Sequence, residues 1–397
     1  MPTHDIDQIL RKLVEMRGSD LHLKADRPPM FRLSSDLVPS EFPVVTDADM
    51  EGIIRKLVGD KGFEKLERDF ENDANYYIKD VARFRVNAFK QMGHYGVIMR
   101  VIPLKIPTID EMNLPAVLKD IVNVPQGLIL VTGPTGSGKS TTLAAMINEL
   151  NMAQPLHIIT IEDPVEFVYT DAKCTINQRQ LGTDVKSLTE ALKRALRQDP
   201  DVILMGEMRD VETIELATHA AETGHVVFST LHTNDAKQTL DRIVDTFPPD
   251  AHHQIRAVLS MTLQAVISQR LVKRADGNGR VASQEILINS PNVRDLIAQG
   301  KVGDIEKAMK EGGFYRMQTF NMSLAKYVKD NIVTEEEALA TTTNANDLKL
   351  TLRGISSGAA TMETLGAQKK AEDAKKAADD AKKAETKAGG MKISKGY

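Results

Sequence analysis

The chain has 397 residues, enough for two or three domains with cores of their own, so a small disulfide-stapled fold is excluded. Hydrophobic residues make up 42% and the chain has one cysteine, so we expect neither a membrane span of roughly 18 unbroken apolar residues, nor an internal disulfide, nor a four-thiolate zinc site. A net charge of -4 gives no general attraction to nucleic acid, and the first residues lack a secretory signal, so we expect a soluble, cytoplasmic protein.

The first hundred residues have the pattern of a small α+β domain, which we expect to span residues 1–103. Apolar residues at helical spacing predict a first helix that ends at Gly18, and a capping-box spacing at Thr46 predicts a second that reaches about Arg68. Segments with strand character lie at Leu21–Leu23, Phe31–Leu33, Tyr76–Ile78, Arg83–Phe89 and Val97–Ile102.

Two arginines stand out in the fourth of these segments. If Arg83–Phe89 is a strand, Arg83 and Arg85 share one face while Phe84 and Val86 share the other. A solvated sheet face explains this pattern on its own. An arginine supplied across a subunit boundary to a phosphoryl group is the alternative.

Proline at positions 103, 107 and 115 interrupts regular structure and predicts a linker over residues 104–116. After it, short β-rich runs alternate with stretches compatible with helices, which predicts an α/β domain over 117–355 with a parallel sheet covered on both faces. A helix is expected from about Ala251 to Leu271, and further helices after Pro291. Residues 356–397 are rich in Ala, Lys, Asp and Glu without an apolar stripe, so we expect a frayed helix or a disordered tail.

The strongest signal is a phosphate-binding loop that follows the predicted strand Gly127–Thr132. Glycines let backbone N–H groups turn toward phosphates, the next helix presents its positive end, the lysine reaches the phosphates and the serine can ligate Mg²⁺. We therefore expect the loop to bind ATP with Mg²⁺. The expected nucleotide-binding residues are Gly133, Pro134, Thr135, Gly136, Ser137, Gly138, Lys139, Ser140 and Thr141.

Carboxylates follow two other predicted strands: Glu162, Asp163 and Glu166 come after one, and Glu207 ends another. Parallel strands end at a common edge, where ligands bind, so these acids are expected near the phosphate loop. Each acid by itself is equally typical of a helix cap or a solvated loop. Together they favour ATP hydrolysis.

Two histidines bracket the predicted strand Val226–Leu231. Histidine near a strand end is most often a structural hydrogen-bonding group. The carboxylates at the neighbouring strand ends favour a second interpretation, in which His232 senses the γ-phosphate. No spacing of His, Cys and Asp indicates a separate metal site, so Mg²⁺ carried by the nucleotide is the metal we infer.

At this point the sequence resembles the secretion ATPase superfamily and, within it, the PilT/PilU-type retraction ATPases of type IV pili, over about residues 4–355. The matching segments are Gly18–Leu23, Arg83–Asn87, Gly133–Ser140, Ile158–Pro164, Arg197–Asp210 and Gly224–His232. The resemblance implies a RecA-like ATPase core preceded by a PAS-like domain, and a homohexameric ring that pulls pilins into the inner membrane.

The resemblance also implies roles for single residues. Glu207 corresponds to the Walker B catalytic glutamate, and His225 and His232 to the His box, with His232 catalytic and His225 beside the nucleotide. Glu162 and Glu166 correspond to the Asp box near metal and water, with Asp163 beside the nucleotide and Glu162 as a candidate Mg²⁺ ligand. Arg83, Arg85 and Arg100 correspond to arginines that reach nucleotide from the PAS-like domain.

The implied partners are the inner-membrane platform protein of the pilus and a second retraction ATPase, at the inner face of the inner membrane. Extension ATPases usually carry a four-cysteine zinc module, which this chain lacks. Asn292–Ile297 matches the retraction motif Ala-Ile-Arg-Asn-Leu-Ile at three of six positions, and Ser268–Leu271 looks more like PilU than PilT. A main retraction motor, an accessory ATPase or assembly module with little hydrolysis, and a motor acting on DNA or a secreted protein all stay open at this stage.

Overall fold

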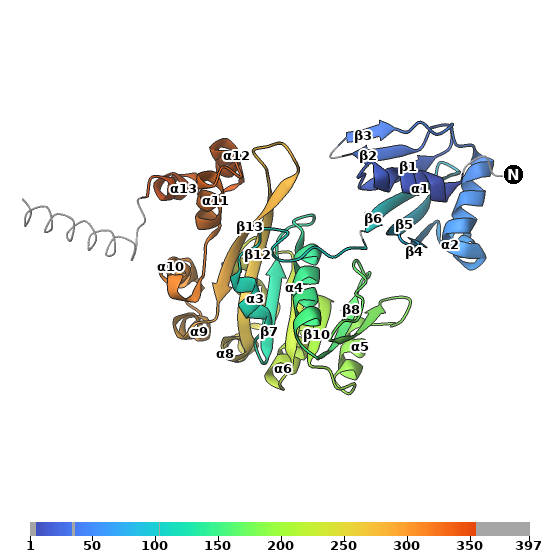
Figure 1. Cartoon of the computed structure of the whole chain (residues 1–397). Coiled ribbons are helices and arrows are strands. Elements are labelled where there is room, and N and C mark those ends of the chain that lie inside the picture. Colours follow the sequence, from blue (N-terminus) through green and yellow to red (C-terminus); the bar gives the residue numbers. More distant parts are fainter. Residues whose placement is uncertain (1–4, 34–35, 103, 355–397) are drawn as a thin grey trace, which may run out of the picture.

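The computed structural model describes residues 5–33, 36–102 and 104–354, and it contains two sheets (Figure 1). The predicted tail at 356–397 lies outside the described residues. The sheets divide the chain where the linker was predicted, but Ile109 and Leu114 of that linker are buried in the core of the second sheet. The predicted domain boundaries stay predictions.

The N-terminal sheet is antiparallel in the order β3-β2-β1-β6-β5-β4. Apolar residues from one of its faces form a single core with helices α1 and α2, as the α+β pattern predicted. Thr46 and Asp49 make the predicted capping box at the start of α2. The elements are α1 (Ile6–Glu15), β1 (Asp20–Lys24), β2 (Met30–Leu33), β3 (Asp36–Pro39), α2 (Asp47–Asp69), β4 (Glu71–Ile78), β5 (Ala82–Gln91) and β6 (His94–Ile102).

The second sheet has the order β13-β12-β7-β11-β10-β8-β9, and all its strands except β13 run parallel to their neighbours. Its central strands are buried on both faces, so residues alternate between two cores: Leu128 and Leu130 of β7 face one core, Ile129 and Val131 the other. The first core contains α5 to α10 and the second contains α3 and α4. This is the predicted α/β architecture.

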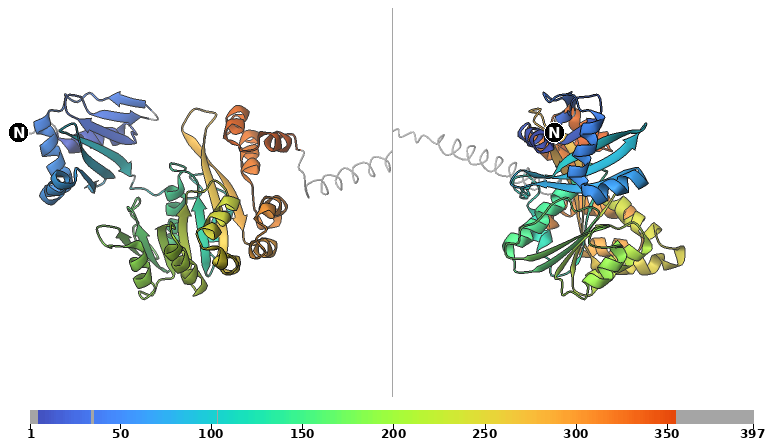
Figure 2. Two further views of the ribbon diagram at one scale, coloured as in Figure 1. Left: turned by 180° about the vertical axis from the view of Figure 1, so that it is seen from behind. Right: turned by 90° about the vertical axis from the view of Figure 1, so that its right-hand side faces the viewer.

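The elements of this part begin with α3 (Val117–Val122), β7 (Gly127–Thr132), α4 (Lys139–Ala153), β8 (His157–Glu162), β9 (Thr175–Gln180), α5 (Leu188–Ala195), β10 (Val202–Glu207), α6 (Val211–Glu222), β11 (Val226–Leu231) and α7 (Ala236–Asp245). They continue with α8 (His252–Thr262), β12 (Leu263–Lys273), β13 (Arg280–Ile288), α9 (Pro291–Ala298), α10 (Ile305–Glu311), α11 (Phe320–Lys329), α12 (Glu335–Thr341) and α13 (Ala345–Leu352). Short 3₁₀ turns lie at Pro249–Ala251, Val302–Asp304 and Gly313–Tyr315. Figure 2 shows α11 to α13 beside the β12–β13 hairpin, on the opposite side of the core from the N-terminal sheet.

The prediction of one helix from Ala251 to Leu271 was wrong in its second half, because α8 ends at Thr262 and the chain continues as strand β12. Five successive residues of β12, from Ala265 to Gln269, are buried. An apolar run that is covered on both faces has no polar alternation, so periodicity cannot separate it from a buried helix. Strands β3, β9 and β13 were not predicted; β3 and β9 are short and rich in polar or proline residues.

Candidate functional site

The phosphate loop connects the buried strand β7 to helix α4. Gly133, Gly136 and Gly138 have φ angles of 144°, 77° and 87°, a region of backbone space that glycine enters without strain. A Cβ on Gly133 would lie 2.4 Å from the carbonyl oxygen of Gln269, so packing also requires glycine there. The backbone therefore has the strand-loop-helix turn that the sequence predicts.

Lys139, the first residue of α4, is folded back onto its own loop. Its Nζ donates hydrogen bonds to the carbonyl oxygens of Gly133 at 2.7 Å and Pro134 at 3.1 Å. Burial lowers the pKa of the ammonium, while the negative charges of Glu207 and Glu166 act to raise it. The lysine thus lies in the electric field of two of the carboxylates that the sequence singled out.

The parallel strands bring the predicted motifs to one edge of the sheet. β7, β11, β10 and β8 are neighbours in this order, so their carboxyl ends follow one another along that edge. The edge carries the phosphate loop after β7, His232 after β11, Glu207 at the end of β10 and Glu162 at the end of β8. This is the edge at which open α/β sheets bind ligands.

Glu207 is held between two basic side chains. Its Oε2 lies 2.9 Å from Nη2 of Arg209 and 3.4 Å from Nε2 of His232, and its side chain is 22% exposed. The hydrogen bond to Glu207 raises the pKa of Arg209. Glu207 therefore offers a positioned carboxylate, still open to water, close to the lysine that would hold phosphates.

Glu162 has a different environment from Glu207. Its Oε1 accepts hydrogen bonds from Oγ1 of Thr160 at 2.6 Å and Nε2 of Gln178 at 3.4 Å, and burial raises its pKa. Three strand spacings of about 4.8 Å put the end of β8 roughly 14 Å from the end of β7. The side chain of Glu162 is thus hydrogen-bonded to residues of β8 and β9. Asp163 and Glu166 lie in the loop that follows β8.

His225 and His232 do not meet. His232 lies at the carboxyl end of β11, whereas His225 precedes its first residue, and six residues at about 3.3 Å each separate the two ends by roughly 20 Å. Nδ1 of His225 lies 2.9 Å from the carbonyl oxygen of Ala220. The expectation that both histidines approach the nucleotide is therefore corrected by the direction of the strand: His225 lies at the opposite edge.

The three predicted arginines lie on the N-terminal sheet. Phe84 and Val86 are fully buried and Arg85 is exposed, so the predicted division of β5 into two faces is what the structure has. The register sets Arg85 opposite Arg100, and Arg100 opposite Asp20, with Nε of Arg100 donating to Oδ1 of Asp20 at 2.9 Å.

The three arginines, Arg83, Arg85 and Arg100, form a row that comes close to the second sheet through strand β4. Asn75 pairs with Arg85 in the register, and its Nδ2 donates to Oε1 of Gln180, at the end of β9, at 3.1 Å. Arg83 lies two residues from Arg85 on the same face and is partly exposed. The structure therefore places these arginines on a separate sheet that touches the core near the acidic strand ends.

Sequence reasoning missed Gln269 and Thr142 as parts of this site. Oγ1 of Thr142, in the first turn of α4, donates to Oε1 of Gln269 at 2.7 Å, and the two residues are 127 positions apart. A glutamine two residues after the apolar run Ala265–Ile267 was the signal that could have found it. Arg209 lies in the matching segment Arg197–Asp210, but the sequence did not indicate it as the partner of Glu207.

Comparison with known proteins places the chain in a family. The family described as "Type II/IV secretion system protein" matches residues 4–367. The chain belongs to this family. The type IV pilus retraction ATPase PilT of Pseudomonas aeruginosa is 47% identical to this secretion-family chain over 334 residues, which cover 84% of the chain and 97% of PilT. The type IV pilus ATPase PilU of the same organism is 40% identical over 354 residues, covering 88% of the chain and 91% of PilU.

A solved structure of the secretion family gives the same result. The crystal structure of the pilus retraction motor PilT with bound ADP matches with a TM-score of 0.81 and 42% identity, covering 87% of this chain and 99% of the other. The predicted family, the α/β fold and the function class, that of pilus-retraction ATPases, are confirmed. Within the described residues, no helix has the length and apolarity to cross a membrane.

Proposed function

We propose that this chain hydrolyses ATP with Mg²⁺ and converts the energy into retraction of type IV pili, as a ring of six copies that pulls pilins into the inner membrane. The observation that carries the proposal is the placement of Lys139 and Glu207 along one sheet edge, close enough for the charge of Glu207 to act on Lys139. The similarity to PilT over most of both chains supports the type IV pilus as the structure on which the motor acts.

The phosphate loop holds the nucleotide. Its backbone N–H groups and the N-terminus of α4 bind the β- and γ-phosphates, and Lys139 exchanges its carbonyl partners for phosphate oxygens. Ser140 supplies a hydroxyl for Mg²⁺, which neutralises developing charge on the phosphates. Mg²⁺ arriving with the nucleotide would be held by the Ser140 hydroxyl, phosphate oxygens and water.

Glu207 positions the attacking water and accepts its proton. Arg209 and His232 hold the carboxylate in place, and His232 is near enough to respond when the γ-phosphate leaves. Asp163 and Glu166 lie in the loop after β8, which is one strand farther from the phosphate loop than Glu207. From there they act on the water and the nucleotide. Glu162 is a candidate metal ligand once its bonds to Thr160 and Gln178 rearrange.

The arginines supply positive charge from the N-terminal domain. Arg83, Arg85 and Arg100 lie on a sheet of their own, so they approach the triphosphate only as that domain moves relative to an ATPase core. In a ring of six, each N-terminal domain serves the neighbouring core. Such a residue is worth about 10³ to 10⁵ in rate, so domain movement and phosphate cleavage become coupled.

The ring acts at the inner face of the inner membrane, against the platform protein of the pilus, and also assembles with a second retraction ATPase. We expect no nucleic-acid partner, because a net charge of -4 gives no general attraction to nucleic acid. A second candidate function is an accessory ATPase with little hydrolysis of its own; the chain is also 40% identical to the type IV pilus ATPase PilU.

The experiment is phosphate release by the purified full-length chain and by Glu207→Gln. We expect turnover to fall by about 10² to 10⁴, because a general base is lost, while ATP binding changes little. Glu212→Gln is the matched control, since Glu212 pairs with Lys193 outside the site at 2.7 Å and its loss should leave turnover unchanged. Equal turnover in Glu207→Gln contradicts the assigned role, and near-zero turnover in the unmodified chain favours the accessory function.

A further inference from the structure

A buried glutamine on strand β12 lies directly behind the phosphate loop. Gln269 is 1% exposed, and its Nε2 donates a hydrogen bond to the carbonyl oxygen of Ser137 at 2.6 Å. Its Oε1 accepts from Oγ1 of Thr142 at 2.7 Å. A Cβ on Gly138 would lie 2.8 Å from the same Nε2. The carboxamide therefore joins the loop to the first turn of α4.

A second buried glutamine continues the connection away from the loop. Nε2 of Gln284, on β13, donates to Oε1 of Gln269 at 2.8 Å, and the backbone N–H of Gln284 donates to Oγ of Ser323, on α11, at 3.3 Å. Oγ of Ser283 also donates to Oγ of Ser323, at 3.1 Å. All four residues are at most 4% exposed. Hydrogen bonds thus run without interruption from Ser137 to α11.

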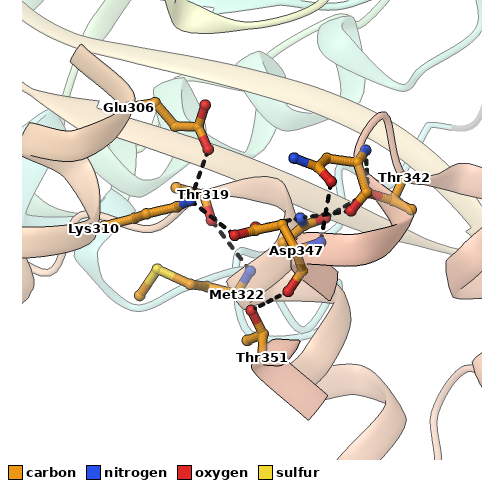
Figure 3. Close-up of polar contacts among 9 residues, drawn as sticks. Glu306, Lys310, Thr319, Met322, Thr342, Asp347 and Thr351 are labelled. Carbon is orange, nitrogen blue, oxygen red and sulfur yellow. Dashed lines mark hydrogen bonds and ion pairs between the residues drawn. The ribbon is translucent and has the colours of Figure 1, made fainter. Parts of the chain in front are cut away.

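A polar cluster around Asp347 connects α11 to its neighbouring helices, and Figure 3 shows Asp347 with Lys310 and Glu306. Nδ2 of Asn321 donates to Oδ2 of Asp347, on α13, at 2.6 Å. Nζ of Lys310, on α10, lies 3.0 Å from Oδ1 of Asp347 and 2.9 Å from Oε1 of Glu306. A shift of α11 is therefore passed to α10 and α13 as well.

The donors and acceptors around Gln269 allow only one orientation of its carboxamide group. The carbonyl of Ser137 can only accept, so the amide nitrogen must face it, and the amide oxygen must face the two donors. A buried polar group that loses its hydrogen-bond partner costs its full desolvation free energy. The phosphate loop, the two glutamines and α11 therefore keep or change their positions together.

We propose that Gln269 is a positioning residue for the ATPase reaction: it fixes the phosphate loop and links it to α11 through Gln284 and Ser323. The proposal rests on the proposed function only in that the loop binds nucleotide. Nucleotide bound at the loop stabilises α11, and by thermodynamic reciprocity a change at α11 alters nucleotide affinity. A partner that contacts the C-terminal helices thereby responds to whether nucleotide is bound at the loop.

The first test compares Gln269→Met with Gln264→Met in the full-length chain. Gln264 is the matched control because it lies on the same strand but donates to the carbonyl of Gln126, at the other end of β7, at 2.9 Å. For Gln269→Met we expect the Kd for ADP with Mg²⁺ and the KM for ATP to rise about tenfold, with a smaller change in kcat. Gln264→Met should match the unmodified chain. An unchanged Kd and KM in Gln269→Met overturns the positioning role.

The second test measures amide hydrogen exchange of α11 with and without ADP and Mg²⁺. We expect ADP to slow exchange in α11 of the unmodified chain and of Gln264→Met, and to have no such effect in Gln269→Met or Ser323→Ala. Ser323→Ala leaves every contact of the loop intact, so it also serves if Gln269→Met does not fold. ADP-dependent protection that persists in Ser323→Ala, or that is absent from the unmodified chain, overturns the link to α11. Failure of the unmodified chain to bind ADP at all instead contradicts the proposed function.

Discussion

The molecule carries two rows of polar side chains, one at the carboxyl edge of the core sheet and one across the face of the N-terminal sheet. In the core row the side chains already engage one another: Lys139 bonds its own loop, and Glu207 lies between Arg209 and His232. In the other row Arg85 and Arg100 are exposed, and Asp20 is the carboxylate bonded to Arg100. In the proposed mechanism, one half of the site is complete within a single sheet, and the arginines are brought to it. Binding should therefore depend on the core and turnover on both.

Arg85→Ala gives the sharpest separation of the two rows. We expect ATP turnover to fall about 10³-fold, because the variant lacks the charge brought to the phosphoryl group, while nucleotide affinity changes little. Phosphate release and ADP titration on the same preparation measure the two quantities. Arg55→Ala is the control, since Arg55 belongs to the same domain but pairs with Glu51 and Asp60 on α2.

Mixing variants shows whether the arginine acts across a subunit boundary. Arg85→Ala and Lys139→Ala each lack a different half of the site, so mixed rings should regain part of the activity at boundaries that combine intact halves. No recovery at any ratio, in rings shown to contain both variants, places the arginine and the loop in the same subunit.

Lys139→Ala tests the core row by itself. Loss of a charge-assisted hydrogen bond to phosphate should weaken ADP binding about 10²-fold. The fold should survive, because both bonds that Lys139 makes are to carbonyl oxygens of its own loop and join no other element to it. Calorimetric titration measures the affinity, and circular dichroism checks the fold. Nucleotide affinity equal to that of the unmodified chain would remove the loop from the proposed mechanism.

A smaller effect is expected from a buried carboxylate outside both rows. Glu285, on β13, is 6% exposed and accepts a hydrogen bond from the backbone N–H of Ala236 at 2.8 Å. Burial raises its pKa from 4.5 to about 7; the charges of Asp235 and Glu306 add to this, while Arg270 opposes it. The folded chain thus binds more protons than the unfolded chain between these values, so its stability falls as the pH rises from about 4.5 to 7.

Glu285→Gln removes this loss of stability. The amide oxygen still accepts from Ala236, and no charge is buried, so the variant should be about 1–3 kcal/mol more stable than the unmodified chain at pH 8. The difference should shrink toward pH 5. Urea unfolding at both pH values measures it, with exposed Glu336→Gln as the control. A difference that does not depend on pH would show that Glu285 does not titrate in this range.

The sequence predicted local features well and contacts between distant segments poorly. The phosphate loop needs only adjacent residues and its flanking strand and helix, so its spacing sufficed. Glu207 and His232 were located because parallel strands share one edge. The resemblance also placed His225 at the nucleotide, but two residues that bracket one strand cannot lie at the same edge. Gln269 was missed because its role arises from partners 127 and 132 positions away.

The bonds of Lys139 to its own loop have a consequence for product release. An ammonium group has three N–H donors, and two of them are engaged by Gly133 and Pro134. Phosphate has to compete with these carbonyls on arrival, and after cleavage the carbonyls draw the lysine back as the charge on the nucleotide falls. The loop thus contains its own substitute ligand, which lowers the apparent affinity for nucleotide and helps to clear the site for the next cycle.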